Sequence, residues 1–167
     1  MKLKHLLLSA IFVIAFGTAQ AQKFGHIDSG ALLELMPEVK KADSLLSMYQ
    51  KSLEESYNNM ITEYQTKLAD FQKKEKTLLD HEKELKQQEL YDLQNRIQTF
   101  QDGAQEKLQS KKQEIYAPIL KKAEDAVKSV AKENGYAYVF DTSVGAVIYA
   151  QDSDNIMPLV KKKLNLK

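Results

Sequence analysis

The feature that most constrains this chain is a stretch of 95 residues, Glu38 to Lys132, built almost entirely from residues that favour α-helices. Apolar residues recur along it in steps of three and four, which is typical of one face of a helix. One such stripe runs from Leu46 to Leu78 and a second from Leu90 to Val130. The stretch therefore predicts long amphipathic helices that bury a continuous apolar seam.

Two antiparallel helices are favoured over a single one, which would extend roughly 140 Å at 1.5 Å per residue. Folding the chain about position 84 brings the apolar positions of the two stripes opposite each other, with bulky Tyr64 facing small Ala104. We therefore predict a coiled-coil hairpin arm over residues 38–132 with its tip near residues 80–88. This tip has none of the Gly, Pro, Asn or Ser that are typical of turns.

Short strands are predicted at both ends of the chain. Lys23–Asp28 forms the first, and Ser29 is expected to cap a brief helix that ends at Leu35. Asn134-Gly135 is a typical helix stop. Residues 136–141 and 146–150 follow as strands rich in β-branched and aromatic side chains, and residues 155–164 as a last helix.

Residues 22–37 and 133–167 are expected to assemble into a small β body that holds both ends of the hairpin. The apolar strand residues assigned to this body are Phe24, Ile27, Tyr138, Val139, Phe140, Val147, Ile148 and Tyr149. Three short strands bury little apolar surface, whereas further copies would close the sheet edges and extend the core. The predicted fold is therefore mainly α, with a small oligomeric, barrel-like β base.

The first 21 residues have the three parts of a secretory signal peptide. Lys2 and Lys4 precede an apolar run from Leu6 to Phe16, and Ala19-Gln20-Ala21 supplies the small residues that signal peptidase recognises. The apolar run is shorter than the roughly 20 residues needed to span a bilayer. We expect export from the cytoplasm and cleavage after Ala21.

Charge and composition limit the classes of function. Cleavage would remove two of the 24 basic residues and leave 22 basic against 23 acidic, which argues against nucleic acid as a partner. The chain has no Cys, and no P-loop, G-x-G-x-x-G or G-x-S-x-G motif occurs in it. We expect no catalytic residue, no metal site and no cofactor.

Four titratable residues remain as candidates for chemistry. His26 lies in the first predicted strand and His81 near the predicted tip, so they do not readily meet within one chain. Asp28 and Asp141 both end strands and could be neighbours. A paired-carboxylate site is one interpretation of them, and Asp residues that hold turns are the preferred one.

Four aromatic residues, three of them Tyr, line the first helical stripe. The preferred interpretation places them in the core of the hairpin, but Tyr is a poor filler of a dry seam because its hydroxyl needs a partner. A stripe partly open to water would instead offer weak, adaptable contact to an apolar client chain. The candidate client-binding residues are Tyr49, Tyr57, Tyr64 and Phe71 of this stripe and, outside it, Met60, Leu79 and Tyr91.

Two further features modify the predicted hairpin. Pro118 lies inside the second helix and is predicted to kink or loosen it, as a hinge. Lysines gather near the tip, where acidic neighbours offset them, and again at Lys161–Lys163. We interpret both clusters as solvated surface, with weak contact to anionic lipid as the alternative.

The layout resembles the Skp/OmpH family of periplasmic chaperones over essentially the whole mature chain. The likeness is carried by the strand Lys23–Asp28 with the following Ser29, the Gln-rich helical stretch Arg96–Phe100, the helix Ala126–Ala131, and the strands Tyr138–Asp141 and Ala146–Tyr149. The resemblance implies a periplasmic homotrimer in which three hairpins surround a cavity. It also implies that unfolded outer-membrane β-barrel proteins are held there without ATP.

The chain departs from this family in its charge. Family members are strongly basic and the mature chain is nearly neutral, so capture by charge should be weaker and no lipopolysaccharide site is assigned. The preferred function is an ATP-independent holdase for unfolded outer-membrane proteins. The alternative is a structural coiled-coil envelope protein that acts as an adaptor for a specific partner or membrane, and an enzyme ranks third.

Overall fold

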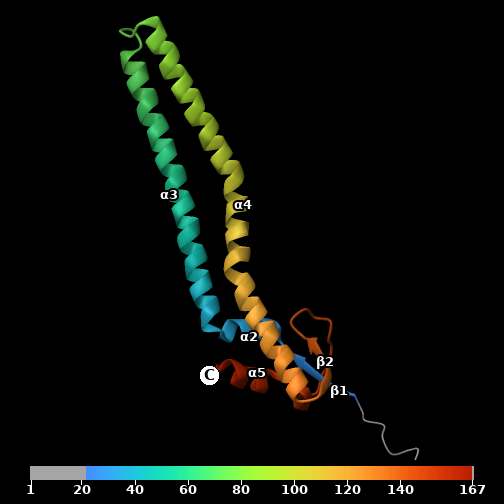
Figure 1. Ribbon diagram of the computed structural model, residues 1–167. Helices are drawn as coiled ribbons and strands as arrows, with labels where there is room; N and C mark the ends of the chain where they lie inside the picture. Colours follow the sequence, from blue (N-terminus) through green and yellow to red (C-terminus); the bar gives the residue numbers. More distant parts are fainter. Residues whose placement is uncertain (1–21, 167) are drawn as a thin grey trace, which may run out of the picture. The chain divides into compact units, whose positions relative to one another are not determined.

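The computed structural model describes residues 22–166, which form two compact units. Residues 22–32 and 125–166 make one unit, called the body here, and residues 33–124 make the other, called the arm. The elements in chain order are β1 (Lys23–Ile27), α2 (Ser29–Leu35), α3 (Pro37–Lys74), α4 (Asp80–Glu133), β2 (Tyr136–Asp141), the 3-10 helix η1 (Asp152–Asp154) and α5 (Met157–Leu164) (Figure 1). The mainly helical fold with a small sheet is confirmed.

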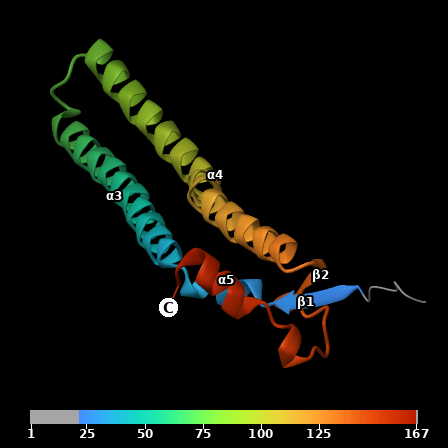
Figure 2. The same ribbon diagram turned by 60° about the horizontal axis from the view of Figure 1, so that its bottom comes forward.

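In the arm, α3 and α4 lie side by side and run antiparallel, as both views show (Figures 1 and 2). The predicted hairpin is therefore confirmed. Pro37 is the first residue of α3, where its missing N–H costs no hydrogen bond. The connection between the helices is short and covers residues 75–79.

The turn precedes the predicted tip at residues 80–88, because α4 already begins at Asp80. Asp80 and Glu82 lie in the first turn of α4, where negative charge stabilises a helix N-terminus. The Glu82 carboxylate also accepts a hydrogen bond of 2.9 Å from the N–H of Leu79, as glutamate does in a capping box. Because α4 starts at Asp80, the chain turns before this residue and not about position 84, where the apolar positions of the two stripes match.

The register of the hairpin also differs from the predicted one, because α4 starts at Asp80. Lys67 pairs with Glu89, Tyr116 with Asp43, and Lys122 with Glu38. In each pair, the two partners lie about equally far from Leu79 along the sequence, so the hairpin folds about this residue. The expected pairing of Tyr64 with Ala104 is therefore wrong, and it is Tyr57 that lines a pocket together with Ala104.

The body is organised around a two-stranded parallel sheet in which Phe24 lies opposite Tyr138 and His26 opposite Phe140. The predicted bounds of β2 are confirmed, and Gly135 ends the preceding turn with a φ of 70°. The predicted strand over residues 146–150 is not formed in the described chain. The second edge of β1 is taken instead by Asn155 and by Ile156, whose N–H donates to the His26 carbonyl at 2.9 Å.

Two helix starts in the body also differ from the predictions. Asp28, not Ser29, caps α2, since its carboxylate accepts a hydrogen bond of 2.9 Å from the N–H of Ala31. The last helix begins at Met157 rather than at Asn155, with Ile156 as the residue before it. The side chain of Asn155 accepts from the Met157 N–H at 2.9 Å.

The body core is small. Ile27 of β1 and Leu32 of α2 are buried together with Ile156 and Val160 at the start of and within α5, and α4 adds Ala126 and Val130. Each of the larger side chains contributes about 1.5–3 kcal/mol when fully buried. So few large residues give one copy of the body little stability of its own.

Candidate binding surfaces of the body and the arm

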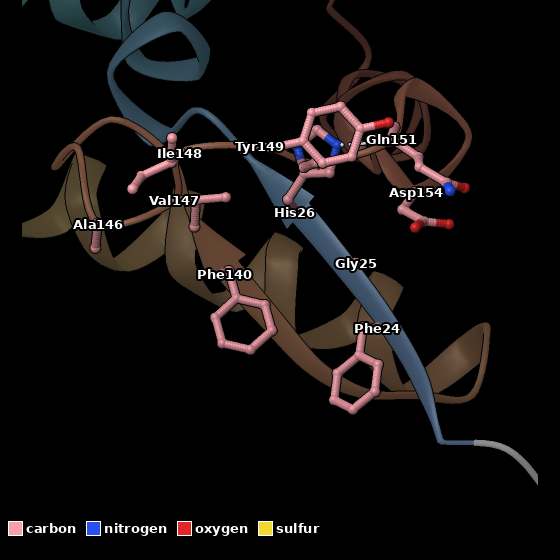
Figure 3. A pocket seen from close by; sticks show the side chains of 11 residues that line it. Phe24, Gly25, His26, Phe140, Ala146, Val147, Ile148, Tyr149, Gln151 and Asp154 are labelled. Atoms are coloured by element: carbon pink, nitrogen blue, oxygen red, sulfur yellow. Dashed lines mark hydrogen bonds between the residues drawn. The ribbon is translucent and has the colours of Figure 1, made fainter.

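A pocket of about 710 Å³ lies on the body, between the two strands and the irregular segment 146–151 (Figure 3). Phe24 and Phe140 line one side of it, and Val147, Ile148 and Tyr149 contribute from the segment. Ile148 is fully exposed and Tyr149 is 82% exposed. The chain therefore presents large apolar side chains here that no described residue covers.

An aromatic cluster continues this surface over the sheet. Phe24, Tyr138 and Phe140 are 46%, 57% and 48% exposed. Their ring centroids lie 5.9 to 6.5 Å apart, within the range of aromatic stacking. The eight residues assigned to the body from the sequence differ in burial. Ile27 is in the core, Val139 and Val147 are half-buried, and the other five are exposed.

The polar groups of the body serve structure. His26 Nε2 lies 3.0 Å from the carbonyl oxygen of Gln151 and donates to it. Asp141 accepts hydrogen bonds from Ser29 N–H at 3.1 Å, Ser29 Oγ at 2.5 Å and Ser143 N–H at 3.0 Å. Asp28 caps α2, so both carboxylates hold turns and helix starts, as preferred from the sequence.

The electrostatics of Asp141 follow from these bonds. Partial burial by itself would raise the pKa of this carboxyl, but the hydrogen bonds from Ser29 and Ser143 outweigh burial and hold the pKa at about 2. The charged form of Asp141 therefore links the end of β2 to the start of α2.

The arm stripe is partly open, since Phe71 is buried while Tyr49, Tyr57 and Tyr64 are half-buried. Of the candidates outside the stripe, Met60 is half-buried, and Leu79 and Tyr91 are exposed. The seam therefore does not fully enclose the three tyrosines, which agrees with a stripe that reaches water.

Sequence reasoning missed Tyr116, which is half-buried and whose hydroxyl donates to the Asp43 carboxylate across the hairpin. This hydrogen bond, followed by burial, raises the pKa of Tyr116. The repeat of apolar residues every three or four positions placed its neighbour Ile115 in the seam, so it did not predict a contact for Tyr116.

A second pocket, of about 290 Å³, lies between the two arm helices. Leu53 and Tyr57 of α3 face Phe100, Ala104 and Leu108 of α4 in its lining. The side chains of Gln50, Glu54, Gln101 and Gln105 also line it. Of these nine residues, only Tyr57 was a candidate from the sequence.

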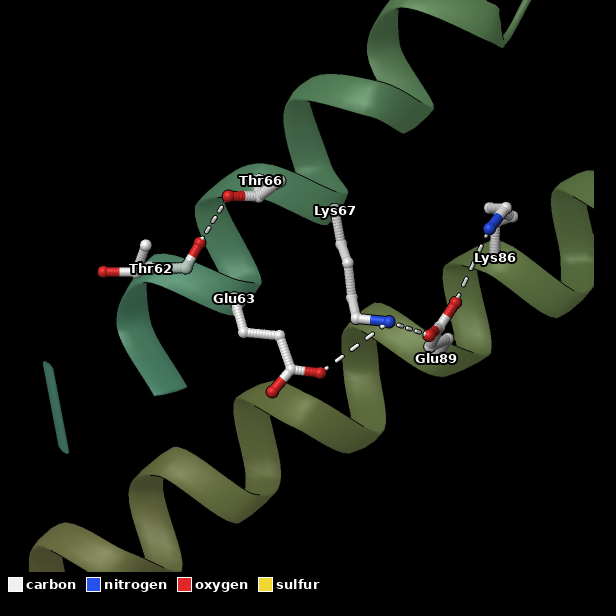
Figure 4. Close-up of polar contacts among 6 residues, drawn as sticks. All are labelled: Thr62, Glu63, Thr66, Lys67, Lys86 and Glu89. Carbon is white, nitrogen blue, oxygen red and sulfur yellow. Dashed lines mark hydrogen bonds and ion pairs between the residues drawn. The ribbon is translucent and has the colours of Figure 1, made fainter. Parts of the chain in front are cut away.

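A polar cluster joins the arm helices closer to the turn (Figure 4). Lys67 of α3 contacts Glu89 of α4 and lies 3.7 Å from Glu63, while Lys86 lies 3.7 Å from Glu89. The hydrogen bond between Lys67 and Glu89 raises the pKa of Lys67 and lowers that of Glu89. The cluster is therefore a polar contact between turns of α3 and α4 that lie side by side.

Residues 22–166 contain no group of three or more His, Asp or Glu residues arranged to hold a metal ion. No helix in the same range has the length and apolar content needed to cross a membrane. The predicted signal peptide and its cleavage after Ala21 lie outside the described residues.

The fold and its exposed apolar surfaces define a helical-hairpin protein with a small sheet-bearing body. Residues 23–164 match the family of OmpH-like outer membrane proteins, so the chain belongs to this family, which is a family of chaperones and not of enzymes. The chain is 29% identical over 157 residues to the Chaperone protein Skp of Yersinia enterocolitica, covering 90% of each chain. It is 27% identical over 173 residues to the Chaperone protein Skp of Photorhabdus laumondii, covering 97% of this chain and 99% of the relative.

The fold itself is shared with a solved structure from Caulobacter crescentus CB15 that is described as OmpH-like. The two superpose with a TM-score of 0.71 at 15% sequence identity, over 89% of this chain and 86% of the other. At this level of identity the likeness concerns the arrangement of the elements and not the residues of a site.

Proposed function

We propose that the protein is an ATP-independent holdase of the periplasm, which binds unfolded outer-membrane β-barrel proteins between helical arms and prevents their aggregation. The observation that carries this proposal is the incompletely buried aromatic stripe of the arm, with Tyr49, Tyr57 and Tyr64 all half-buried. Amphipathic tyrosines at a wet surface make weak, adaptable contacts with apolar chains. Membership in a chaperone family supports the same function.

The proposal includes a homotrimer that is held together by the body and encloses a cavity between its arms. A parallel sheet normally has both faces covered, whereas this two-stranded sheet carries three exposed aromatic rings. Exposed apolar patches of this kind mark interaction surfaces. Three copies are taken from the resemblance to the family. Export through a signal peptide that is cleaved after Ala21 places the trimer in the periplasm.

Weak contact with anionic lipid is a minor part of the proposal. Lys163 is paired with Glu133 at 2.5 Å, and near the turn Lys74 lies 2.6 Å from Asp70 and Lys83 3.3 Å from Asp80. Lysines that already have acidic neighbours attract lipid head groups less than free ones. Solvated surface therefore remains the preferred interpretation of both lysine clusters.

The test is light scattering from a urea-unfolded outer-membrane β-barrel protein that is diluted into buffer without ATP, with and without the mature protein. We expect suppressed aggregation near one trimer per client. The variant Tyr57→Ser/Tyr64→Ser should suppress aggregation less well, because it removes two aromatic contact surfaces from the stripe. Its matched control is Asn58→Ser/Gln65→Ser, at the neighbouring exposed positions of α3.

Undiminished scattering with several different clients would overturn the holdase proposal. The alternative, an envelope adaptor, would then be preferred, since an adaptor binds one folded partner and not many unfolded chains.

A further inference from the structure

The pocket between the arm helices has an apolar floor of limited size. Leu53 and Tyr57 form one wall and Phe100 and Leu108 the other, while the short side chain of Ala104 leaves the space between them open. An apolar cavity of about 150 Å³ is enough to hold a benzene ring. The volume here, about 290 Å³, therefore suits one aromatic side chain with its stem.

The remaining lining residues are polar and carry no positive charge. Gln50, Gln101 and Gln105 each offer an amide that both donates and accepts hydrogen bonds. The single carboxylate, Glu54, already accepts a hydrogen bond of 3.1 Å from the side chain of Gln50. Such groups match the unpaired N–H and C=O groups of an extended backbone, which every unfolded segment has.

We propose that this pocket binds one aromatic side chain of an extended, uncharged client segment, whose backbone hydrogen-bonds to the surrounding glutamines. The proposal rests on the holdase function and assigns it a defined contact point on each arm. An aromatic occupant is favoured over an aliphatic one of similar size because the rings of Tyr57 and Phe100 offer stacking contacts.

The absence of Trp from the chain provides a direct probe. A short peptide of Ser, Thr and Gln with one central Trp would be titrated with the full mature protein under selective tryptophan excitation, so that all emission comes from the peptide. We expect its emission maximum to shift to the blue on binding. A peptide with Phe in place of Trp should compete for the pocket, and one with Ala should not.

The variant Ala104→Leu fills the pocket with a good helix former, and we expect it to weaken peptide binding by roughly tenfold. Ala69→Leu is the matched control, because it adds the same side chain at a position of α3 outside the pocket. Helix content by circular dichroism checks that both variants are folded. Unchanged affinity in folded Ala104→Leu would overturn the proposal, as would the absence of any blue shift with the unmodified chain.

A second measurement uses the unmodified chain and needs no folded variant. A peptide with a photoreactive phenylalanine analogue in place of Trp should cross-link to Tyr57, Phe100 or Leu108. Cross-links confined to the body or to the turn would overturn the pocket as the site. Light scattering from an unfolded β-barrel protein decides the holdase function separately, because suppression by the unmodified chain can persist when peptide binding to this pocket fails.

Discussion

Asp141 is a charged residue that stabilises the body by linking β2 to α2. Replacing it with Asn keeps the shape of the side chain but removes the charge that accepts hydrogen bonds from Ser29 and Ser143. We expect Asp141→Asn to lower the free energy of unfolding by about 1–2 kcal/mol at neutral pH, after allowance for partial exposure. Urea unfolding followed by circular dichroism measures this difference.

The pH dependence of that difference has a defined sign. The pKa of Asp141 falls from 3.8 to about 2 on folding, so the unfolded chain binds more protons between these two values. The stabilisation is fully present above about pH 4 and is lost as the pH falls through the folded-state value. The gap between the unmodified chain and Asp141→Asn should therefore close near pH 2, while the control Asp152→Asn, at an exposed position, stays level with the unmodified chain. A gap that persists undiminished in that acid range would contradict the role of the charge.

Gly25 is a second residue on which the body depends. A Cβ at this position would lie 3.0 Å from Cγ2 of Ile156 and 3.0 Å from the ring of Tyr136, closer than ordinary van der Waals contact. We expect Gly25→Ala to destabilise the body by about 1–3 kcal/mol, as overpacking does. Gly145→Ala is not a suitable control because its φ is 71°, whereas Gly103→Ala is suitable, since a Cβ there meets no atom within 4 Å. Gly103→Ala should not destabilise the chain, and thermal unfolding separates the two variants.

At the scale of elements, the cluster around Lys67 joins the two helices of the hairpin in their observed register. Lys67→Glu would place a third carboxylate beside those of Glu63 and Glu89, and we expect it to lower the thermal midpoint of the arm. Adding Glu89→Lys should restore the midpoint only in part, because Glu63 would still face a carboxylate at position 67 and Lys86 would face a second ammonium group at position 89. High salt should shrink all these differences. Full recovery by the double variant would show that Glu63 and Lys86 contribute nothing.

The same cluster predicts a loosening at acid pH. The pKa of Glu89 is lowered by its hydrogen bond to Lys67, so the link is complete above the ordinary carboxylate range and is lost as the pH falls through the lowered value.

Pro118 is the element-scale feature that stays a prediction. It lies inside α4, where the chain has no N–H to donate to the carbonyl four residues earlier. If it is a hinge, Pro118→Ala should narrow the spread of distances between spin labels placed at Gln65→Cys on different copies. Pro118→Gly, which removes the ring but keeps a weak point in the helix, should leave the spread broad. Equal spreads of the distances in the unmodified protein, Pro118→Ala and Pro118→Gly would contradict the prediction of a hinge.

The helices and the strand β2 were predictable because their signals are local. Steps of three and four define α3 and α4, and Asn134-Gly135 stops α4 at the observed place. The register was mispredicted, because apolar periodicity recurs every turn and matches at several offsets, whereas Asp80 and Glu82 start α4 at one position. The pocket at Ala104 could not be predicted, since it depends on that register.

At the scale of the whole molecule, the segment 146–150 was predicted as a strand, but within residues 22–166 it forms none. Its β-branched and aromatic residues are those of a strand, and a strand forms only where a neighbouring edge pairs with it. A neighbouring copy could provide an edge for this segment, which is why its residues belong to the proposed interface.

If copies associate through the body, Ile148 is the residue at which this can be tested most directly. Its side chain is fully exposed in one chain and lines the body pocket, so burial in an assembly would give it about 1.5–3 kcal/mol, and a buried charge at this place would be unfavourable. We expect Ile148→Asp to shift the mass seen in analytical ultracentrifugation from trimer to monomer. Val144→Asp is the control, because Val144 is 72% exposed and is not among the pocket lining residues.

A client held between several arms needs several copies, so Ile148→Asp should also lose suppression of aggregation in proportion to its monomer fraction. A folded Ile148→Asp that stays trimeric would place the interface elsewhere, and a monomer that still suppresses aggregation fully would show that a single arm is enough.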